Sequence, residues 1–169
     1  MSIKDNPERP TQEEYGDNYR PHLLEQYKLY VEMADRVSQR RATANTFFLT
    51  LNTGLLGLAT GLAGFSFDAA QIWAISWGAA TFGLGFSYVW WRILESYRQL
   101  NSAKYKVVGD LEAKLPVAPY DDEWETVGRG NNPKLYLQLT VVEARVPKLF
   151  GLGYFMVAIV AGVFFVRSL

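Results

Sequence analysis

The residues best suited to chemistry in this chain are four closely spaced carboxylates. Asp121, Asp122, Glu123 and Glu125 follow a stretch that holds two prolines, and their oxygen atoms are the ligands that divalent cations prefer. Their spacing matches no metal-binding loop, so the sequence favours an exposed loop or the start of a short helix, with Trp124 anchored to neighbouring helices. We therefore expect neither a metal nor a cofactor.

The rest of the composition indicates that the chain is not an enzyme. Cysteine is absent and His22 is the only histidine, which excludes disulfides and thiolate chemistry and leaves a multi-histidine metal site to a symmetric oligomer. The sequence contains no nucleophile paired with a base and no phosphate-binding loop. Its 17 basic and 17 acidic residues balance, so charge does not suggest nucleic acid as a partner.

A second group of polar side chains stands inside an apolar stretch. Asn45, Thr46 and Asn52 belong to this group, and unsatisfied amides are costly in hydrocarbon. These side chains must therefore face protein partners or water. Two interpretations remain open: the residues line a polar pore, or they form hydrogen bonds between helices.

Three long apolar stretches predict transmembrane helices at residues 44–67, 70–91 and 149–167. Their only Asp, Glu, Lys or Arg is Arg167, at the end of the third stretch. At about 1.5 Å per residue, each covers the roughly 30 Å hydrocarbon core of a bilayer. A tight turn around Asp68 makes the first two a helical hairpin. The alternative, three buried core helices of a soluble protein, leaves too little chain to cover them.

Basic residues near the ends of the predicted spans set the expected orientation. Lys and Arg are retained on the cytoplasmic side of a membrane. They precede the first span, follow the second and precede the third: Arg36, Arg40, Arg41, Arg92, Arg98, Arg145 and Lys148. The hairpin turn carries Asp68, and only Arg167 lies on the opposite side. We expect a multi-pass protein with a cytoplasmic N-terminus and a periplasmic C-terminus.

Small residues at helical spacing mark the expected packing faces of the spans, because helices in lipid associate through close contact. The candidates are a GxxxG pair in the first span and small residues in the other two: Gly57, Gly61, Gly78, Gly83, Ala158 and Gly162. Such residues serve either the hairpin within one chain or contacts between copies.

Two amphipathic patterns extend the hairpin into the cytoplasm. Residues 21–43 predict a helix whose apolar face has spacings of three and four: Leu23, Tyr27, Tyr30, Ala34 and Val37. A similar face follows the second span until Pro116 ends it: Leu94, Tyr97, Asn101, Lys104, Val108, Leu111 and Leu115. Because the hairpin turn is tight, we expect the two extensions to pack antiparallel as a coiled-coil-like stalk. The fold class is an all-α membrane protein.

The remaining segments complete the expected domain organisation. Residues 92–148 form a cytoplasmic helical domain, and residues 1–20 form a polar N-terminal segment that is mobile or draped over a neighbour. Asn132 and Pro133 have the chemistry of a helix start. We therefore expect a helix to restart there and to continue through Leu135 and Leu139 toward the third span.

Several of these segments resemble one bacterial family. The stretch from Tyr27 to Phe48, which includes Arg40-Arg41 and Asn45-Thr46-Phe47-Phe48, resembles the RipA-like membrane proteins, as do Ser96 to Lys104 and Leu115-Pro116. The chain is more distantly similar to SLATT two-helix membrane domains, to whose pattern it adds a third span. The resemblance implies a bacterial inner-membrane protein that assembles with itself as an octamer, without enzymatic activity. SLATT domains are regarded as pore-forming effectors in bacterial conflict systems.

These observations support one leading hypothesis and two alternatives. The leading hypothesis is a non-enzymatic homo-oligomer in the lipid of the inner membrane, whose spans and stalk form a ring around a pore. The first alternative is a membrane-anchored scaffold that recruits a cytoplasmic protein through the loop between Pro116 and Pro133. The second, a small-molecule transporter, is weaker because no charged residue lies deep in a span.

Overall fold

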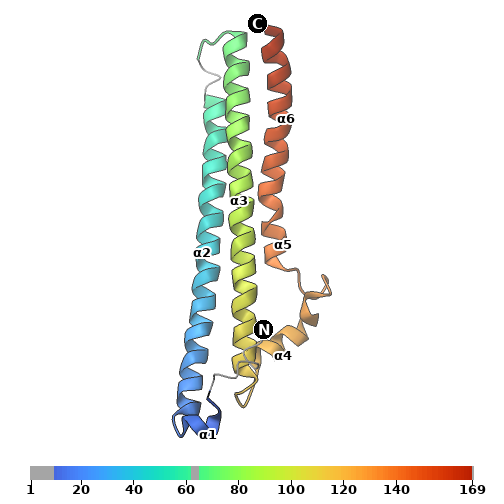
Figure 1. Cartoon of the computed structure of the whole chain (residues 1–169). Coiled ribbons are helices and arrows are strands. Elements are labelled where there is room, and N and C mark those ends of the chain that lie inside the picture. The colour runs from blue at the N-terminus through green and yellow to red at the C-terminus, as the bar shows by residue number, and fades with distance from the viewer. Residues whose placement is uncertain (1–9, 62–64, 169) are drawn as a thin grey trace. The chain divides into compact units, whose positions relative to one another are not determined.

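The computed structural model describes residues 10–61 and 65–168, and every regular element in these ranges is helical (Figure 1). The elements are α1 (Gln12–Tyr15), α2 (Tyr19–Gly61), α3 (Ala69–Glu112), α4 (Pro119–Thr126), the short 3₁₀ helix η3 (Gly128–Gly130), α5 (Leu139–Glu143) and α6 (Arg145–Ser168). The predicted all-α class is confirmed. The chain forms two compact units, a first unit of residues 1–40 and 97–138 and a second unit of residues 41–96 and 139–169.

In the first unit, helix α1 begins with a reciprocal cap. The Thr11 hydroxyl accepts a hydrogen bond from the Glu14 backbone N–H at 3.3 Å, and Glu14 Oε2 accepts one from the Thr11 N–H at 2.7 Å. This is the capping box that a Thr-x-x-Glu pattern specifies. Helix α1 and the start of α2 thus lie within the N-terminal segment that was predicted to be mobile or draped over a neighbour. Residues 1–9 of that segment lie outside the described part of the chain.

In the first unit, the predicted apolar faces of α2 and α3 meet. Leu23, Ala34 and Val37 of α2 are buried, as are Val108 and Leu111 of α3. Two side-chain hydrogen bonds fix the direction of packing: Tyr27 to Glu112 at 2.8 Å, and Asn101 to Ser38 at 3.0 Å. Later positions in α2 pair with earlier positions in α3, so these parts of the two helices run antiparallel, as predicted.

The segment after α3 differs from the prediction. No helix begins at Pro133. Instead, Asn132 Oδ1 accepts a hydrogen bond from the Lys134 N–H at 3.1 Å, and the Asn132 carbonyl accepts from the N–H groups of Leu135 and Tyr136. Side-chain bonds of this kind compete with helix formation. They close an isolated turn, and the next helix, α5, begins only at Leu139.

The second unit is built around Trp90 of α3. Trp90 is fully buried and packs with Phe48 of α2 and with Leu94. Its ring also lies 5.8 Å from that of Phe150 in α6. Near the other end of the unit, the rings of Trp73 and Phe164 stack at 4.8 Å. In this unit α3 therefore lies between α2 and α6 (Figure 1).

Helix α6 starts as a separate element because of Pro147. Proline has no N–H to donate to the carbonyl four residues earlier, and its ring clashes with that carbonyl. The residue four positions before Pro147 is Glu143, where α5 ends, and a turn at Ala144 separates the two helices. Pro147 then sits in the first turn of α6, where a missing N–H is tolerated.

Within the described residues, one helical stretch is long and apolar enough to cross a membrane. It runs from Leu139 to Ser168, and only 11% of its most apolar window is buried inside the chain. The other two predicted spans are less apolar because they contain Asn, Thr, Ser, Gly, Trp and Tyr. The first of them, 44–67, also includes residues 62–64, which the structure does not describe. Three spans therefore stay a prediction.

Candidate functional site

The two asparagines singled out from the sequence both lie at contacts inside the second unit. Asn45 Oδ1 accepts a hydrogen bond from the indole N–H of Trp90 at 3.1 Å, which joins α2 to α3. Asn52 is fully buried, and its amide donates to the Phe48 carbonyl at 2.8 Å. In a single chain, neither side chain is directed at an open surface.

Besides the ion-paired atoms Arg41 Nε and Glu143 Oε2, three buried polar atoms in this unit have no hydrogen-bond partner among the described residues. They are Asn52 Oδ1, Ser87 Oγ and the Tyr154 hydroxyl. Each is shielded from water, and a buried polar group without a partner costs about 1–3 kcal/mol. Sequence reasoning selected Asn52 but neither Ser87 nor Tyr154, because Ser and Tyr are ordinary residues in a membrane helix.

The candidate packing residues divide into two kinds. A Cβ atom built on Gly83 would lie 2.5 Å from the Tyr154 ring, and one on Gly162 would lie 3.2 Å from the Trp77 ring. These two glycines therefore permit the close approach of α3 and α6. A Cβ on Gly57, Gly61 or Gly78 would meet no heavy atom within 4 Å, and Ala158 is half-buried. Contacts within a single chain therefore do not explain why positions 57, 61 and 78 are glycine.

Helix α2 presents a face of small and weakly polar residues. Thr46, Thr50, Thr53 and Gly57 are exposed, and spacings of four, three and four place them on one side of a helix. At about 100° per residue, this side lies opposite the one that carries Phe48 and Asn52. We call Thr46, Thr50, Thr53 and Gly57 the threonine face of α2.

The second unit also exposes many large apolar side chains. They occur on all of its long helices, among them Phe47, Leu58, Phe82, Leu149, Met156 and Val166. Monomeric soluble proteins do not expose contiguous apolar surface on this scale. The surface requires lipid or further protein to cover it.

A single ion pair joins α2 to α5 in the second unit. Arg41 Nε lies 3.2 Å from Glu143 Oε2, and the two side chains are only 12% and 16% exposed. Both atoms are buried and their alignment is not that of a hydrogen bond, so the attraction is ionic. Loss of either charge would leave the other shielded from water.

The acidic stretch of the first unit forms helix α4 instead of a metal site. Asp121 and Asp122 occupy its first turn, where negative charge is favourable. Arg129 contacts Asp121 at 3.2 Å and Glu125 at 2.8 Å, and these contacts raise the pKa of the Arg129 guanidinium. No cluster of His, Cys, Asp or Glu that could hold a metal occurs in the described residues.

Glu112 is a buried carboxylate in the first unit that sequence reasoning missed. It is 1% exposed, and Oε1 accepts hydrogen bonds from the Tyr27 hydroxyl at 2.8 Å and from the Tyr120 N–H at 3.1 Å. Burial, together with the hydrogen bond and the charge of Glu112, raises the pKa of Tyr27 to about 12. Glu112 thereby links α2, α3 and the start of α4.

These features define an all-helical membrane protein: one apolar helix is long enough to span a bilayer, and the apolar surface around it is exposed. Residues 24–164 match the model of the octameric membrane protein family (8xMP), and the chain belongs to that family. The family's description agrees with the octameric self-assembly that the sequence resemblance implies. No curated protein and no solved structure matches the chain significantly.

Proposed function

We propose that this protein is a non-enzymatic homo-oligomer of the bacterial inner membrane whose copies form a ring around a pore. Each copy crosses the bilayer at residues 44–67, 70–91 and 149–167, and the threonine face of α2 lines the passage. The observations that carry the proposal are the large apolar side chains exposed on the second unit and the exposed threonine face on α2.

The chemistry of the threonine face suits a narrow aqueous passage or a tight contact between copies. Hydroxyl groups can replace part of an ion's hydration shell, while small side chains let helices approach closely. Thr53 already donates its hydroxyl to the Leu49 carbonyl at 2.9 Å, so its oxygen can still accept a hydrogen bond. Because Asn45 and Asn52 are used inside the chain, Thr46 is the member of the original polar trio that fits a lining.

A cysteine-substitution experiment tests the pore, since the chain has no native cysteine to interfere. Purified Thr50→Cys protein in liposomes is expected to conduct ions, and a charged methanethiosulfonate reagent should block most of the flux. Val160→Cys, on the exposed apolar surface of α6, is the matched control and should be insensitive. Absence of ion flux under all conditions, or equal insensitivity of Thr50→Cys, contradicts a pore lined by this face.

A scaffold is the second candidate, and one observation favours it. Val117, in the loop between Pro116 and Pro133, is 69% exposed. Leu135 and Leu137, just after that loop, are 62% and 58% exposed. Exposed apolar residues in a polar surrounding mark protein-binding surfaces. The scaffold predicts a soluble protein that co-purifies with the chain and is lost from the Leu135→Ser/Leu137→Ser variant. Loss of that protein, together with the absence of ion flux, would favour the scaffold over the pore.

A further inference from the structure

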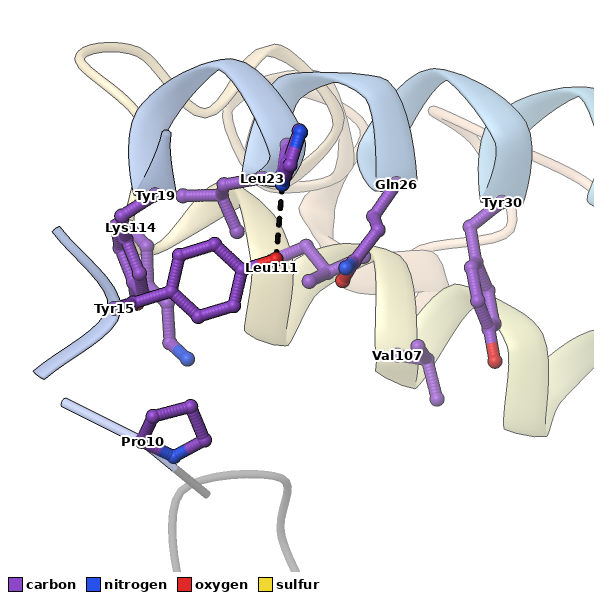
Figure 2. A pocket seen from close by; sticks show the side chains of 10 residues that line it. Pro10, Tyr15, Tyr19, Leu23, Gln26, Tyr30, Val107, Leu111 and Lys114 are labelled. Carbon is purple, nitrogen blue, oxygen red and sulfur yellow. Dashed lines mark hydrogen bonds between the residues drawn. The ribbon is translucent and has the colours of Figure 1, made fainter. Parts of the chain in front are cut away.

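A cavity of about 330 Å³ lies in the first unit between α1, α2 and α3 (Figure 2). This volume falls within the range of small-molecule sites. The buried side chains of Leu23 and Leu111 form part of its apolar lining. The cavity is open to solvent through its exposed lining residues, so a ligand can enter without unfolding the helices.

The walls of the cavity are unusually rich in rings. Tyr15, Tyr19, His22 and Tyr30 all line it. The Tyr15 ring meets those of Tyr19 and His22 edge to face, with centroids 5.9 and 5.8 Å apart. The Tyr15 hydroxyl is also 2.9 Å from His22 Nδ1 (Figure 2). These contacts, with the capping box of α1, fix the aromatic wall before any ligand binds.

The charge of the lining is positive. Lys114 is the only Lys, Arg, Asp or Glu among the lining residues, and no ion pair of Lys114 occurs within the described ranges. Lys104 of α3 does not line the cavity, but its ammonium lies 5.6 Å from the centroid of the Tyr30 ring, which does. Among the described residues that line the cavity, an entering anion therefore meets the Lys114 ammonium and no carboxylate.

We propose that this cavity binds a planar aromatic molecule that carries one anionic group, a phosphate or a carboxylate. The ring packs against the tyrosine walls, as aromatic faces favour, and the anion binds the Lys114 ammonium through a charge-assisted hydrogen bond. The Gln26 amide, also in the lining, supplies a neutral donor and acceptor for polar edges of the ring. The site makes the first unit a ligand-binding module and does not depend on the proposed pore.

Equilibrium dialysis of the full-length protein in lipid nanodiscs tests the site with AMP as the probe, because AMP joins a planar ring to one phosphate. Adenosine and inorganic phosphate are the separated halves. We expect saturable binding of one AMP per chain, and binding of each half at least tenfold weaker. A charge-assisted hydrogen bond contributes about 1.5–3 kcal/mol, which corresponds to roughly 10- to 100-fold in affinity.

Matched variants assign the binding to the cavity. Lys114→Met should weaken AMP binding about tenfold or more and leave adenosine binding unchanged, whereas Lys114→Arg should retain AMP binding. Tyr19→Leu should weaken both AMP and adenosine. Lys106→Met, at an exposed lysine of α3 that does not line the cavity, is the control and should have no effect. Absence of saturable AMP binding, or equal losses from Lys114→Met and Lys106→Met, overturns the proposal.

Discussion

The indole N–H of Trp90 donates a hydrogen bond of 3.1 Å to Asn45 Oδ1, and the same ring stacks on Phe48 with an interplanar angle of 10°. Trp90 also contacts Phe150 of α6. One fully buried side chain of α3 thus contacts both of the other long helices in the second unit. The register of all three helices depends on it.

Breaking this hydrogen bond should destabilise the second unit measurably. Trp90→Phe keeps an aromatic ring but removes the donor, so Asn45 Oδ1 loses its partner. We expect a coupling energy of about 1 kcal/mol between the two positions. The measurement is a double-mutant cycle of Trp90→Phe and Asn45→Leu, followed by unfolding in a denaturing detergent. Tyr88→Phe, at an exposed aromatic residue of the same helix, is the control. Additive effects in the cycle would show that the bond contributes nothing.

Adding a methyl group at two neighbouring glycines should have opposite effects. At Gly83 the new Cβ would lie 2.5 Å from the buried ring of Tyr154, and overpacking of this kind costs about 1–3 kcal/mol. At Gly85 a Cβ meets nothing within 4 Å, and alanine favours the helix by about 1 kcal/mol. Unfolding of Gly83→Ala and Gly85→Ala in the same detergent compares them directly. Destabilisation by both variants, or by neither, contradicts the packing of α6 on α3.

The helical framework could be predicted from the sequence because its signals are local and periodic. The apolar faces through Leu23 and Val37 in α2 and through Val108 in α3 fixed which sides of the helices meet. The third span was predicted to begin at residue 149, whereas α6 begins at Arg145. The missing N–H of Pro147 interrupts the helix four residues earlier, at Glu143. The predicted helix start at Pro133 was wrong because the side chain and the carbonyl of Asn132 accept the next backbone N–H groups and close an isolated turn.

The Arg41–Glu143 ion pair predicts strong asymmetry between single and paired substitutions. Glu143→Gln leaves the Arg41 guanidinium largely shielded from water without its counter-charge, and removal of one partner of a buried pair costs roughly 3 kcal/mol. The charge-swapped protein, Arg41→Glu with Glu143→Arg, should recover a large part of that loss. Thermal unfolding in detergent measures both. Equal stability of the wild type and Glu143→Gln would mean that the pair is solvated.

The first unit should lose stability in alkali through Tyr27. Its pKa is raised from 10.0 to about 12 in the folded chain, so folding favours the protonated phenol. The stabilisation is fully present below pH 10 and is lost as the pH rises through 12. Hydrogen exchange of the backbone amides of α4 across this range measures the effect, because Glu112 joins Tyr27 to Tyr120. The Tyr27→Phe protein should lack this pH dependence. If its exchange profile matched that of the wild type, the pH dependence would belong to another group.

The site features were harder to predict than the fold because they depend on pairs of residues that are distant in sequence. Asn45 and Asn52 were selected as polar residues in an apolar stretch, but nothing local indicated that Trp90 or the Phe48 carbonyl would engage them. The aromatic cavity depends on the fold of α1, whose Thr11-Glu14 capping signal was present in the sequence and overlooked. Glu112 gave no signal, because a buried carboxylate is recognisable only from its partners.

The central claim is that the apolar surface of the second unit lies in lipid and that three spans place the chain ends on opposite sides of the membrane. Single cysteines at Gln12 and Ser168, labelled in cells with a thiol reagent that does not cross the inner membrane, test it most directly. The account predicts labelling of Ser168→Cys in intact spheroplasts and labelling of Gln12→Cys only after the membrane is opened. Labelling of both positions from the same side, or recovery of the protein in the soluble fraction without detergent, would contradict it.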